Sequence, residues 1–435
     1  MSTVARTSAP RPSRGGHGPT KEPAYRSSRR SGSRLSRVGR LVLQGGAGRV
    51  DVVLASAVIA LIGFGVVMVY SASSFEATVK FNDAQHFLKR QAVYAGMALA
   101  VMWVVSRIDY HHLRRLTYPI LLAVVGMLTA TIAGLGHRAG NAYRWLAVGP
   151  VHVQPSEVAK VALVLWLAYS LSKKGARVRT FWVGVVPHLM VVGFLMVLCL
   201  RQPDFGSAVV LLLLTLTMLF ISGVRLVYLF SFTAVFSVVG AALIRFSGYR
   251  YARFVSWLDL EQHRQGMAYQ PFQSVMSFGS GGLFGLGLGR GLQVLYLPEA
   301  HTDFVAAIVG EELGFVGICV MCGVYLLVVA RGVKIALNAA DDYGAYIAFG
   351  LSALVGIQVL TNLAVAMAIL PTKGLTLPFV SYGGSSLLVS SAAIGVLLNI
   401  SRRRPEAPAP ERVVEDGPLP SASAVVATSA EEASA

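Results

Sequence analysis

Residues 182–222 read WVGVVPHLMVVGFLMVLCLRQPDFGSAVVLLLLTLTMLFIS. Two apolar runs, roughly 182–200 and 207–222, flank a polar break that contains Asp204. A run of about 20 apolar residues is what an α-helix needs to cross a bilayer. Pro203 and Gly206 favour a turn between two such helices. The stretch therefore predicts two membrane helices joined by a short turn, with one carboxylate at the membrane boundary.

The composition of the whole chain points the same way. Its 435 residues are 54% hydrophobic and only 14% charged, whereas soluble domains carry about 25% charged residues. The three cysteines, Cys199, Cys319 and Cys322, lie inside apolar runs. They are interpreted as small hydrophobic residues and not as a disulfide framework or a metal site. The chain is predicted to be an all-α integral membrane protein.

About ten transmembrane helices are expected. They are 52–70, 92–106, 117–135, 157–172, 182–200, 207–222, 226–244, 303–330, 344–369 and 382–400. An even number of spans puts both termini on one side. Lys and Arg are about twice as frequent in the segments of that side, which predicts cytoplasmic termini. The longest extracellular loop, 245–302, then connects spans 7 and 8.

Two tails flank the membrane domain, which is predicted to cover residues 51–404. Residues 1–50 hold many Arg and Lys residues with Ser, Gly and Pro, and account for much of the net charge of +17. They predict a disordered basic cytoplasmic tail that contacts anionic membrane lipid; nucleic acid is not expected. Residues 405–435, rich in Pro, Ala and Glu, predict a second disordered cytoplasmic tail.

Most polar clusters fall in the predicted outer segments. Asp204, beside Arg201, is interpreted either as the N-cap of the following helix or as a general base. Arg138 and Arg144 run against the inside bias for positive charge, and guanidinium groups bind phosphate. Lys373 and the Ser385–Ser386 pair, which follows two glycines, add a further candidate anion site.

Other polar residues allow a structural and a functional interpretation. Glu157 and Lys160, three residues apart at a helix start, predict an ion pair, and Gln358 and Asn362 are expected to hold helices together. The glycines of 279–291 resemble a dinucleotide-binding motif, but no strand precedes them, so that interpretation is rejected. The alternating Glu299, His301 and Asp303 suggest metal ligands or acids that cap a helix.

Several motifs together resemble one known family. In chain order they are Tyr70-Ser-Ala-Ser, Lys89-Arg-Gln, Asn141 through Trp145, Gln154-Pro-Ser-Glu, Gln202-Pro-Asp-Phe-Gly, Pro298-Glu-Ala-His-Thr-Asp-Phe and Ser381-Tyr-Gly-Gly-Ser-Ser. From about residue 50 to 404, the chain is similar to the SEDS proteins (shape, elongation, division and sporulation). The stretch 371–378, PTKGLTLP, resembles the division branch, and the basic N-terminal extension resembles actinobacterial members.

The resemblance implies a peptidoglycan glycosyltransferase that polymerises lipid II at the outer face of the cytoplasmic membrane, at the division septum. Asp204 would be the catalytic carboxylate. The resemblance also implies three kinds of partner: lipid II, a class B penicillin-binding transpeptidase and other division proteins. A divalent cation, Mg²⁺ or Mn²⁺, is compatible with this chemistry, with Asp204, Glu299 and Asp303 as candidate ligands; no organic cofactor is implied. The candidate substrate-binding residues are Arg90, Arg138, Asn141, Arg144, Arg201, Gln202, Gln273, His301, Lys373, Ser385 and Ser386.

Three alternatives remain open. A lipid II flippase would need a polar path through the membrane, whereas the polar clusters here gather on one predicted face. An elongation-type polymerase differs from the division type only in one short stretch. A non-catalytic division scaffold would leave the costly polar residues of that face without a task.

Overall fold

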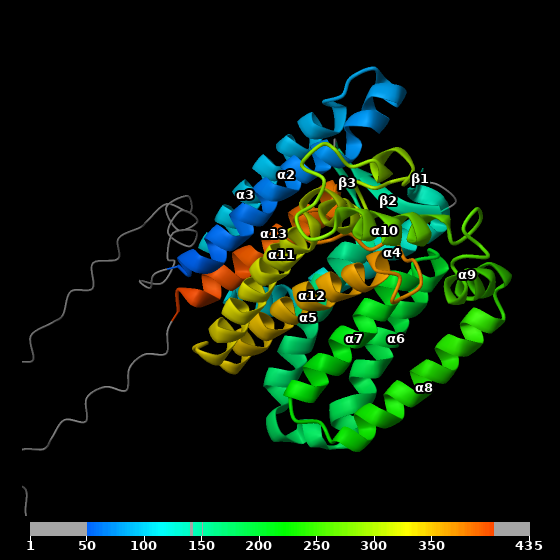
Figure 1. Ribbon diagram of the computed structural model, residues 1–435. Coiled ribbons are helices and arrows are strands. Elements are labelled where there is room, and N and C mark those ends of the chain that lie inside the picture. Colours follow the sequence, from blue (N-terminus) through cyan, green and yellow to red (C-terminus); the bar gives the residue numbers. More distant parts are fainter. Residues whose placement is uncertain (1–49, 140–141, 150, 404–435) are drawn as a thin grey trace, which may run out of the picture. The chain divides into compact units, whose positions relative to one another are not determined.

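The computed structural model describes residues 50–139, 142–149 and 151–403, which fold mainly into helices (Figure 1). Apart from residue 50, the predicted tails lie outside these residues. The long helices are α2 (Val52–Phe81), α3 (His86–Arg107), α4 (His111–Ala130), α5 (Pro155–Lys174), α6 (Val186–Arg201), α7 (Phe205–Ile221), α8 (Leu226–Arg245), α9 (Gly248–Leu258), α10 (Tyr269–Gly281), α11 (Val305–Leu337), α12 (Asp342–Ala366) and α13 (Gly384–Ser401). Short helical turns are η1 (Thr131–Leu135), η2 (Gly175–Arg179), η3 (Phe181–Val185) and η4 (Gln293–Leu295).

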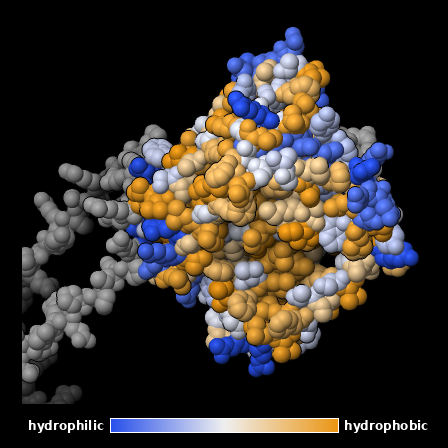
Figure 2. Space-filling model, viewed as in Figure 1, coloured by the Kyte–Doolittle hydropathy of each residue, from blue (hydrophilic) through white to orange (hydrophobic). Residues whose placement is uncertain are grey.

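Each of the ten predicted spans coincides with one of these helices. Among the described residues, seven helical segments are long and apolar enough to cross a membrane by length and composition; α7 is apolar but shorter. α3 and α5 are not among the seven, because both carry charged residues near their ends. Large apolar side chains such as Leu122, Phe230 and Leu326 are about 70% exposed, and apolar residues cover much of the surface in Figure 2. A surface of this kind suits lipid and not water.

The all-α expectation is wrong for residues 137–153. Three strands, β1 (His137–Ala139), β2 (Ala142–Val148) and β3 (Val151–Val153), form an antiparallel sheet in the order β1-β2-β3. Leu146 pairs with Val153 and Arg138 with Tyr143. The cause is local, because β2 contains Tyr143, Trp145 and Val148, residue types that are enriched in strands, and Gly149, at φ +63°, turns the chain toward β3.

The helices pack around a central group that includes α5, α12 and α13. α3 lies along α13, α11 along α12, and α4 along α5 (Figure 1). Helix α13 is the most enclosed of the seven apolar segments, because 72% of its residues are buried inside the protein. In α8, only 6% of an 18-residue apolar stretch is buried. The bundle is therefore tight at its centre and loose at α8.

One end of the bundle collects most of the predicted outer segments. The Asn362 side chain in α12 donates to the carbonyl oxygens of Asp303 (3.0 Å) and Leu375 (2.6 Å). The Tyr382 amide donates to the His301 carbonyl at 2.8 Å. Trp257 of α9 donates through Nε1 to the carbonyl of Ala368 at 2.7 Å. These bonds fasten the 245–302 connection and the 367–383 connection to each other, as the predicted topology requires.

Candidate active site

Asp204 lies in the turn between α6 and α7. Its Oδ1 accepts a hydrogen bond from the Ser207 amide at 3.0 Å, so the side chain caps α7. Its Oδ2 is buried and has no hydrogen-bond partner among the described residues. A buried carboxylate oxygen without a partner is costly. Asp204 therefore combines the two roles considered for it: one oxygen holds the helix, and the other is available to a ligand or a proton.

Arg144 of β2 fixes the same turn. Its Nε donates to the Gln202 carbonyl at 3.1 Å, and its Nη2 donates to the Pro203 carbonyl at 2.7 Å. Both bonds go to main-chain oxygens, and Arg144 forms no salt bridge with a carboxylate among the described residues. The sheet therefore places a guanidinium on the turn that carries Asp204.

Gln202 connects the α6–α7 turn to the end of α4. Its side-chain amide donates to the Leu128 carbonyl at 2.9 Å and to the Thr131 hydroxyl. The residue is 3% exposed. Gln202 was expected to bind substrate, but its amide NH₂ group is already used to join the α6–α7 turn to the end of α4.

Asp303 is the second carboxylate of the site. It lies two residues before α11, outside the membrane-spanning helix, although the sequence pattern placed it at the start of span 8. Loss of water around the carboxylate raises its pKa to about 7, with a further contribution from Glu299. Arg144 and Arg253 oppose this shift, and Asp204 adds to it. Asp303 thus shares one electrostatic site with Asp204 and two guanidinium groups.

Two further cations flank Phe205, the residue after Asp204. The Lys373 ammonium lies 4.7 Å from the ring centroid, and the Arg250 guanidinium lies 5.8 Å from it. Both are within the range of a cation–π contact. Burial lowers the pKa of Lys373 to about 8. In the described part of the chain, neither cation forms a salt bridge.

Sequence reasoning missed Arg250 and Arg253. Both lie on α9, three residues apart, so they project from the same side of the helix. The signal was present in the sequence GYRYARFVSWL, which alternates cations with aromatic residues. It could not be used because nothing in the sequence shows that α9 folds back onto the α6–α7 turn. We call Arg144, Arg250, Arg253 and Lys373 the cation cluster.

A second candidate binding site lies at the N-terminal end of α3. A cavity of about 510 Å³ is lined by Lys89, Arg90, Val93, Tyr94, Met97, His152 and Tyr382. Its cations lie at the N-terminal end of α3, and its apolar residues one and two turns further along. A cavity lined by both charged and apolar side chains suits an amphiphile. Arg90, a predicted substrate-binding residue, belongs to this cavity and not to the cation cluster.

The remaining outer candidates are dispersed. The backbone of Arg138 lies in β1, and Asn141 lies outside the described residues. Arg201 is exposed at the end of α6, and Gln273 is half-buried in α10. None of these residues can be assigned to the cation cluster from the described contacts.

Three other candidates hold the fold of this end. Ser385 accepts a hydrogen bond from the Gln154 amide at 3.0 Å, and Ser386 accepts one from Thr376 at 2.9 Å. His301 is buried, and its Nδ1 lies 3.5 Å from a Glu76 carboxylate oxygen. The two serine hydroxyls are therefore occupied by protein contacts, whereas His301 Nδ1 has no hydrogen-bond partner among the described residues.

The polar residues expected inside the bundle lie at helix contacts. Lys160 Nζ is 2.7 Å from Glu157 Oε1, and both side chains are buried in α5. Gln358 is buried in α12. Asn362, one turn further along the same helix, bridges the two loops described above. The bridge places the main chain of Asp303 directly.

The candidate metal ligands do not form a dedicated metal site. Among the described residues, no group of three or more His, Cys, Asp or Glu side chains could hold an ion. Asp204 and Asp303 nevertheless repel each other electrostatically. Such a pair fits Mg²⁺ that is held by one or two carboxylates together with substrate phosphates.

Comparison with known proteins places the chain in a family. The model for the FtsW/RodA/SpoVE family, described as cell cycle protein, matches residues 52–406. The chain belongs to this family. Family members named "Probable peptidoglycan glycosyltransferase FtsW" are 44% identical in Trichlorobacter lovleyi, over 81% of this chain and 93% of the relative, and in Geobacter sulfurreducens, over 83% and 97%. The Bacillus subtilis member, stage V sporulation protein E, is 38% identical over 81% of this chain and 97% of its own. These relatives give no support to the expected actinobacterial origin.

Solved structures of the family share the fold. A chain from a peptidoglycan synthase complex that coordinates polymerization and crosslinking matches with a TM-score of 0.68 at 29% identity, covering 81% of this chain and 98% of that one. The rod shape determining protein RodA of Thermus thermophilus matches with a TM-score of 0.62 at 29% identity, covering 82% and 98%. The apolar helices and the family together make the chain a multi-pass membrane protein.

Proposed function

We propose that the chain is a peptidoglycan glycosyltransferase that polymerises lipid II at the outer face of the cytoplasmic membrane. The observation that carries this proposal is a site in which two carboxylates, Asp303 and Asp204, lie with the cation cluster, and in which burial raises the pKa of Asp303 to about 7. A general base works best when its pKa is near the working pH. The names of the relatives supply the class of reaction.

The reaction assigns a task to each group. A carboxylate takes the proton of the acceptor sugar's 4-hydroxyl as that oxygen attacks the anomeric carbon of the donor. A carbon–oxygen bond forms with inversion, and the bond from the anomeric carbon to the lipid pyrophosphate breaks. Asp303 is the better base because its environment stabilises the protonated form near neutral pH. Asp204, expected from the sequence to be the base, remains the second candidate through its unpartnered Oδ2.

The cation cluster has the charge needed for the leaving group. Negative charge grows on the pyrophosphate in the transition state, and fixed cations in a partly buried site stabilise it. Arg144 is held by two carbonyl oxygens, so it needs little reorganisation as the charge develops. Bound Mg²⁺ or Mn²⁺ would add further positive charge, held by the carboxylate that does not take the proton together with the substrate phosphates.

We assign the protein to septal synthesis in cell division. The two FtsW relatives described above are 44% identical to the chain, against 38% for stage V sporulation protein E, and the PTKGLTLP stretch points the same way. The matching synthase complex couples polymerization to crosslinking, which supports a class B penicillin-binding transpeptidase as partner. Contact with other division proteins, and with anionic lipid through the basic tail, is part of the same proposal.

A lipid II flippase is the alternative activity. It would need polar groups along a path between the two faces. The cation cluster and both carboxylates lie at one end of the bundle, which favours an enzyme acting there over a transporter.

The test is polymerisation of purified lipid II, with and without the transpeptidase partner and divalent ions. Wild-type protein should form glycan chains. Asp303→Asn should lose the activity by about 10²-fold or more while keeping its partner and its thermal stability. Asp204→Asn, in parallel, decides between the two carboxylates, because the base is the one whose loss removes the chemical step. Movement of lipid II between leaflets without glycan formation would overturn the proposal in favour of a flippase.

A further inference from the structure

Helix α11 is interrupted near its outer end, and a glycine-rich loop fills the interruption. The backbone leaves helical geometry at Gly314, with φ +67° and ψ −165°. Beyond this point the amides of Phe315 and Val316 donate to the carbonyls of Gly282 and Leu283, at 2.9 and 3.1 Å. In return, the loop donates from two amides to the carbonyls of Glu311 and Glu312, both at 3.0 Å. We call residues 282–293 together with 311–316 the glycine latch.

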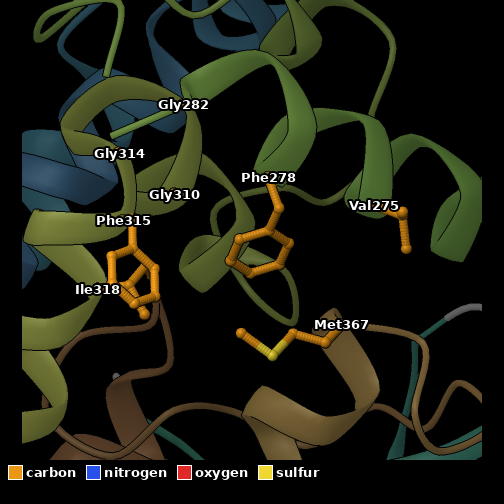
Figure 3. Close-up of a pocket in the computed structure, with 8 residues that line it drawn as sticks. All are labelled: Val275, Phe278, Gly282, Gly310, Gly314, Phe315, Ile318 and Met367. Carbon is orange, nitrogen blue, oxygen red and sulfur yellow. The ribbon is translucent and has the colours of Figure 1, made fainter. Parts of the chain in front are cut away.

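The glycine latch requires a glycine where the 282–293 loop comes closest to the backbone of α11. A Cβ atom on Gly285, whose φ is +79°, would lie 2.2 Å from the Glu312 carbonyl oxygen. Figure 3 shows the adjoining apolar pocket of about 220 Å³, into which Phe278 of α10 and Phe315 of α11 project. The two segments thus meet backbone to backbone, with aromatic side chains closing the side next to them.

Two buried carboxylates complete the latch. Glu311 and Glu312 are 0% and 1% exposed. Glu311 Oε1 accepts from the amides of Leu292 and Gln293, at 2.7 and 3.0 Å. Glu312 accepts from the Ser71 hydroxyl of α2 at 2.6 Å, and the Ser71 oxygen accepts from the Gly289 amide at 3.2 Å. Burying two acids side by side is expensive, and the site described above does not use them.

The geometry points to a task for these acids. The segment held by Glu311 begins at Leu292 and runs directly to Asp303, where Asn362 holds the main chain again. We propose that Glu311 and Glu312 are positioning residues: through the glycine latch they fix the 292–303 segment and so set the place of Asp303 relative to the cation cluster. The inference rests on the proposed function, since it assigns Asp303 a part in the reaction.

Glu311→Gln tests the anchor. It keeps the shape of the side chain but loses the charge and one acceptor oxygen. We expect kcat for lipid II polymerisation to fall about tenfold or more with little change in KM, because a misplacement of about 1 Å can cost about 10²-fold. The pH at which activity rises should also shift, and hydrogen exchange of residues 282–296 should become faster. Glu261→Gln is the matched control, since Glu261 is exposed on the same connection; it should change none of these.

Gly285→Ala reaches the latch without touching a carboxylate. Its methyl group would force the loop away from α11 and should reproduce the loss of kcat and the faster exchange. Gly279→Ala is its control, because a methyl group there meets open space on α10. If Glu311→Gln does not fold, comparison of Gly285→Ala with Gly279→Ala still decides the test.

The outcomes separate the two proposals. Inactive wild-type protein would overturn the proposed function. Active wild-type protein with normal kcat and pH profile in folded Glu311→Gln and Gly285→Ala would overturn the latch proposal alone. Faster exchange of 282–296 with unchanged kcat would also overturn it, because the loop would then be held for stability and not for positioning.

Discussion

Two groups of charged side chains, at opposite ends of the helical bundle, differ in their partners. At the end where the described chain begins and finishes, Arg331 pairs with Asp51 at 2.8 Å and Arg403 pairs with Asp109 at 2.5 Å. At the other end, Arg144 donates to carbonyls, and Lys373 faces an aromatic ring. Paired charges fasten helices to one another, whereas charges without a counter-ion in the described structure leave room for a charged ligand. The comparison separates the ion pairs of Arg331 and Arg403, which fasten helices, from the cations that lie near Asp204 and Asp303.

The largest effect should follow loss of Arg144. Arg144→Ala removes a guanidinium beside both carboxylates and frees the α6–α7 turn. We expect kcat/KM for lipid II to fall by about 10²-fold, similar to the removal of one preorganised donor in other enzymes. Arg144→Lys should recover only part of this, since an ammonium cannot reach both carbonyls with a fork geometry. Unchanged kinetics in Arg144→Ala would mean that the residue is structural.

Lys373 should have a smaller effect that depends on pH. Burial lowers its pKa to about 8, so the side chain is charged below this pH and loses its charge above it. Activity should therefore decline above about pH 8. Lys373→Arg keeps the charge at all accessible pH values and should abolish the decline, as measured by kcat from pH 6 to 10. A decline that survives in Lys373→Arg would assign it to another group.

At the paired end, a substitution should change stability and not chemistry. Arg331→Ala leaves Asp51, the N-cap of α2, without its counter-ion. A partly exposed pair of this kind contributes about 1 kcal/mol, so the unfolding temperature in detergent should fall by a few degrees. The kcat of the folded protein should stay within about twofold of wild type. A large loss of kcat would contradict the division of the molecule into two ends.

The smallest effect should be a shift of the acid limb of the pH profile. Asp303 acts as a base only when deprotonated, so activity should rise through about pH 7. Glu299 raises the pKa of Asp303 by repulsion. Glu299→Gln should lower that pKa and move the limb to lower pH, by less than about one unit. Arg253→Gln removes an opposing cation and should move the limb to higher pH; equal directions in both variants would contradict the electrostatic site.

The sequence was sufficient where the signal is local. Apolar runs predicted each of the ten helices expected to span the membrane, and Pro203 and Gly206 predicted the turn at Asp204. The end of the bundle that carries the site could be predicted because its polar residues stand out against apolar neighbours. The number of membrane crossings and the side on which each end lies stay predictions, because length and charge alone support them.

The rest of the site depends on contacts between distant segments. Arg250 lies against Phe205 and Arg253 acts on Asp303 in a fold where Trp257 of α9 is bonded to Ala368, just after α12, and no periodic pattern in 245–302 predicts this. Asp303 and Asp204 are about a hundred residues apart in sequence, so their interaction could not be predicted from spacing. The strands of 137–153 were missed because the pattern of apolar spans around them dominated the interpretation.

Helix α8 gives this arrangement a sensitivity to its surroundings. Only 6% of an 18-residue apolar stretch of this helix is buried inside the protein. The thickness of the hydrocarbon layer and the packing of acyl chains therefore largely decide the tilt of the helix. Its last turn leads after two residues into α9, which carries Arg250 and Arg253. Reconstitution in bilayers of short and long acyl chains should therefore change the turnover of an otherwise unaltered protein, so that lipid becomes a determinant of rate alongside sequence.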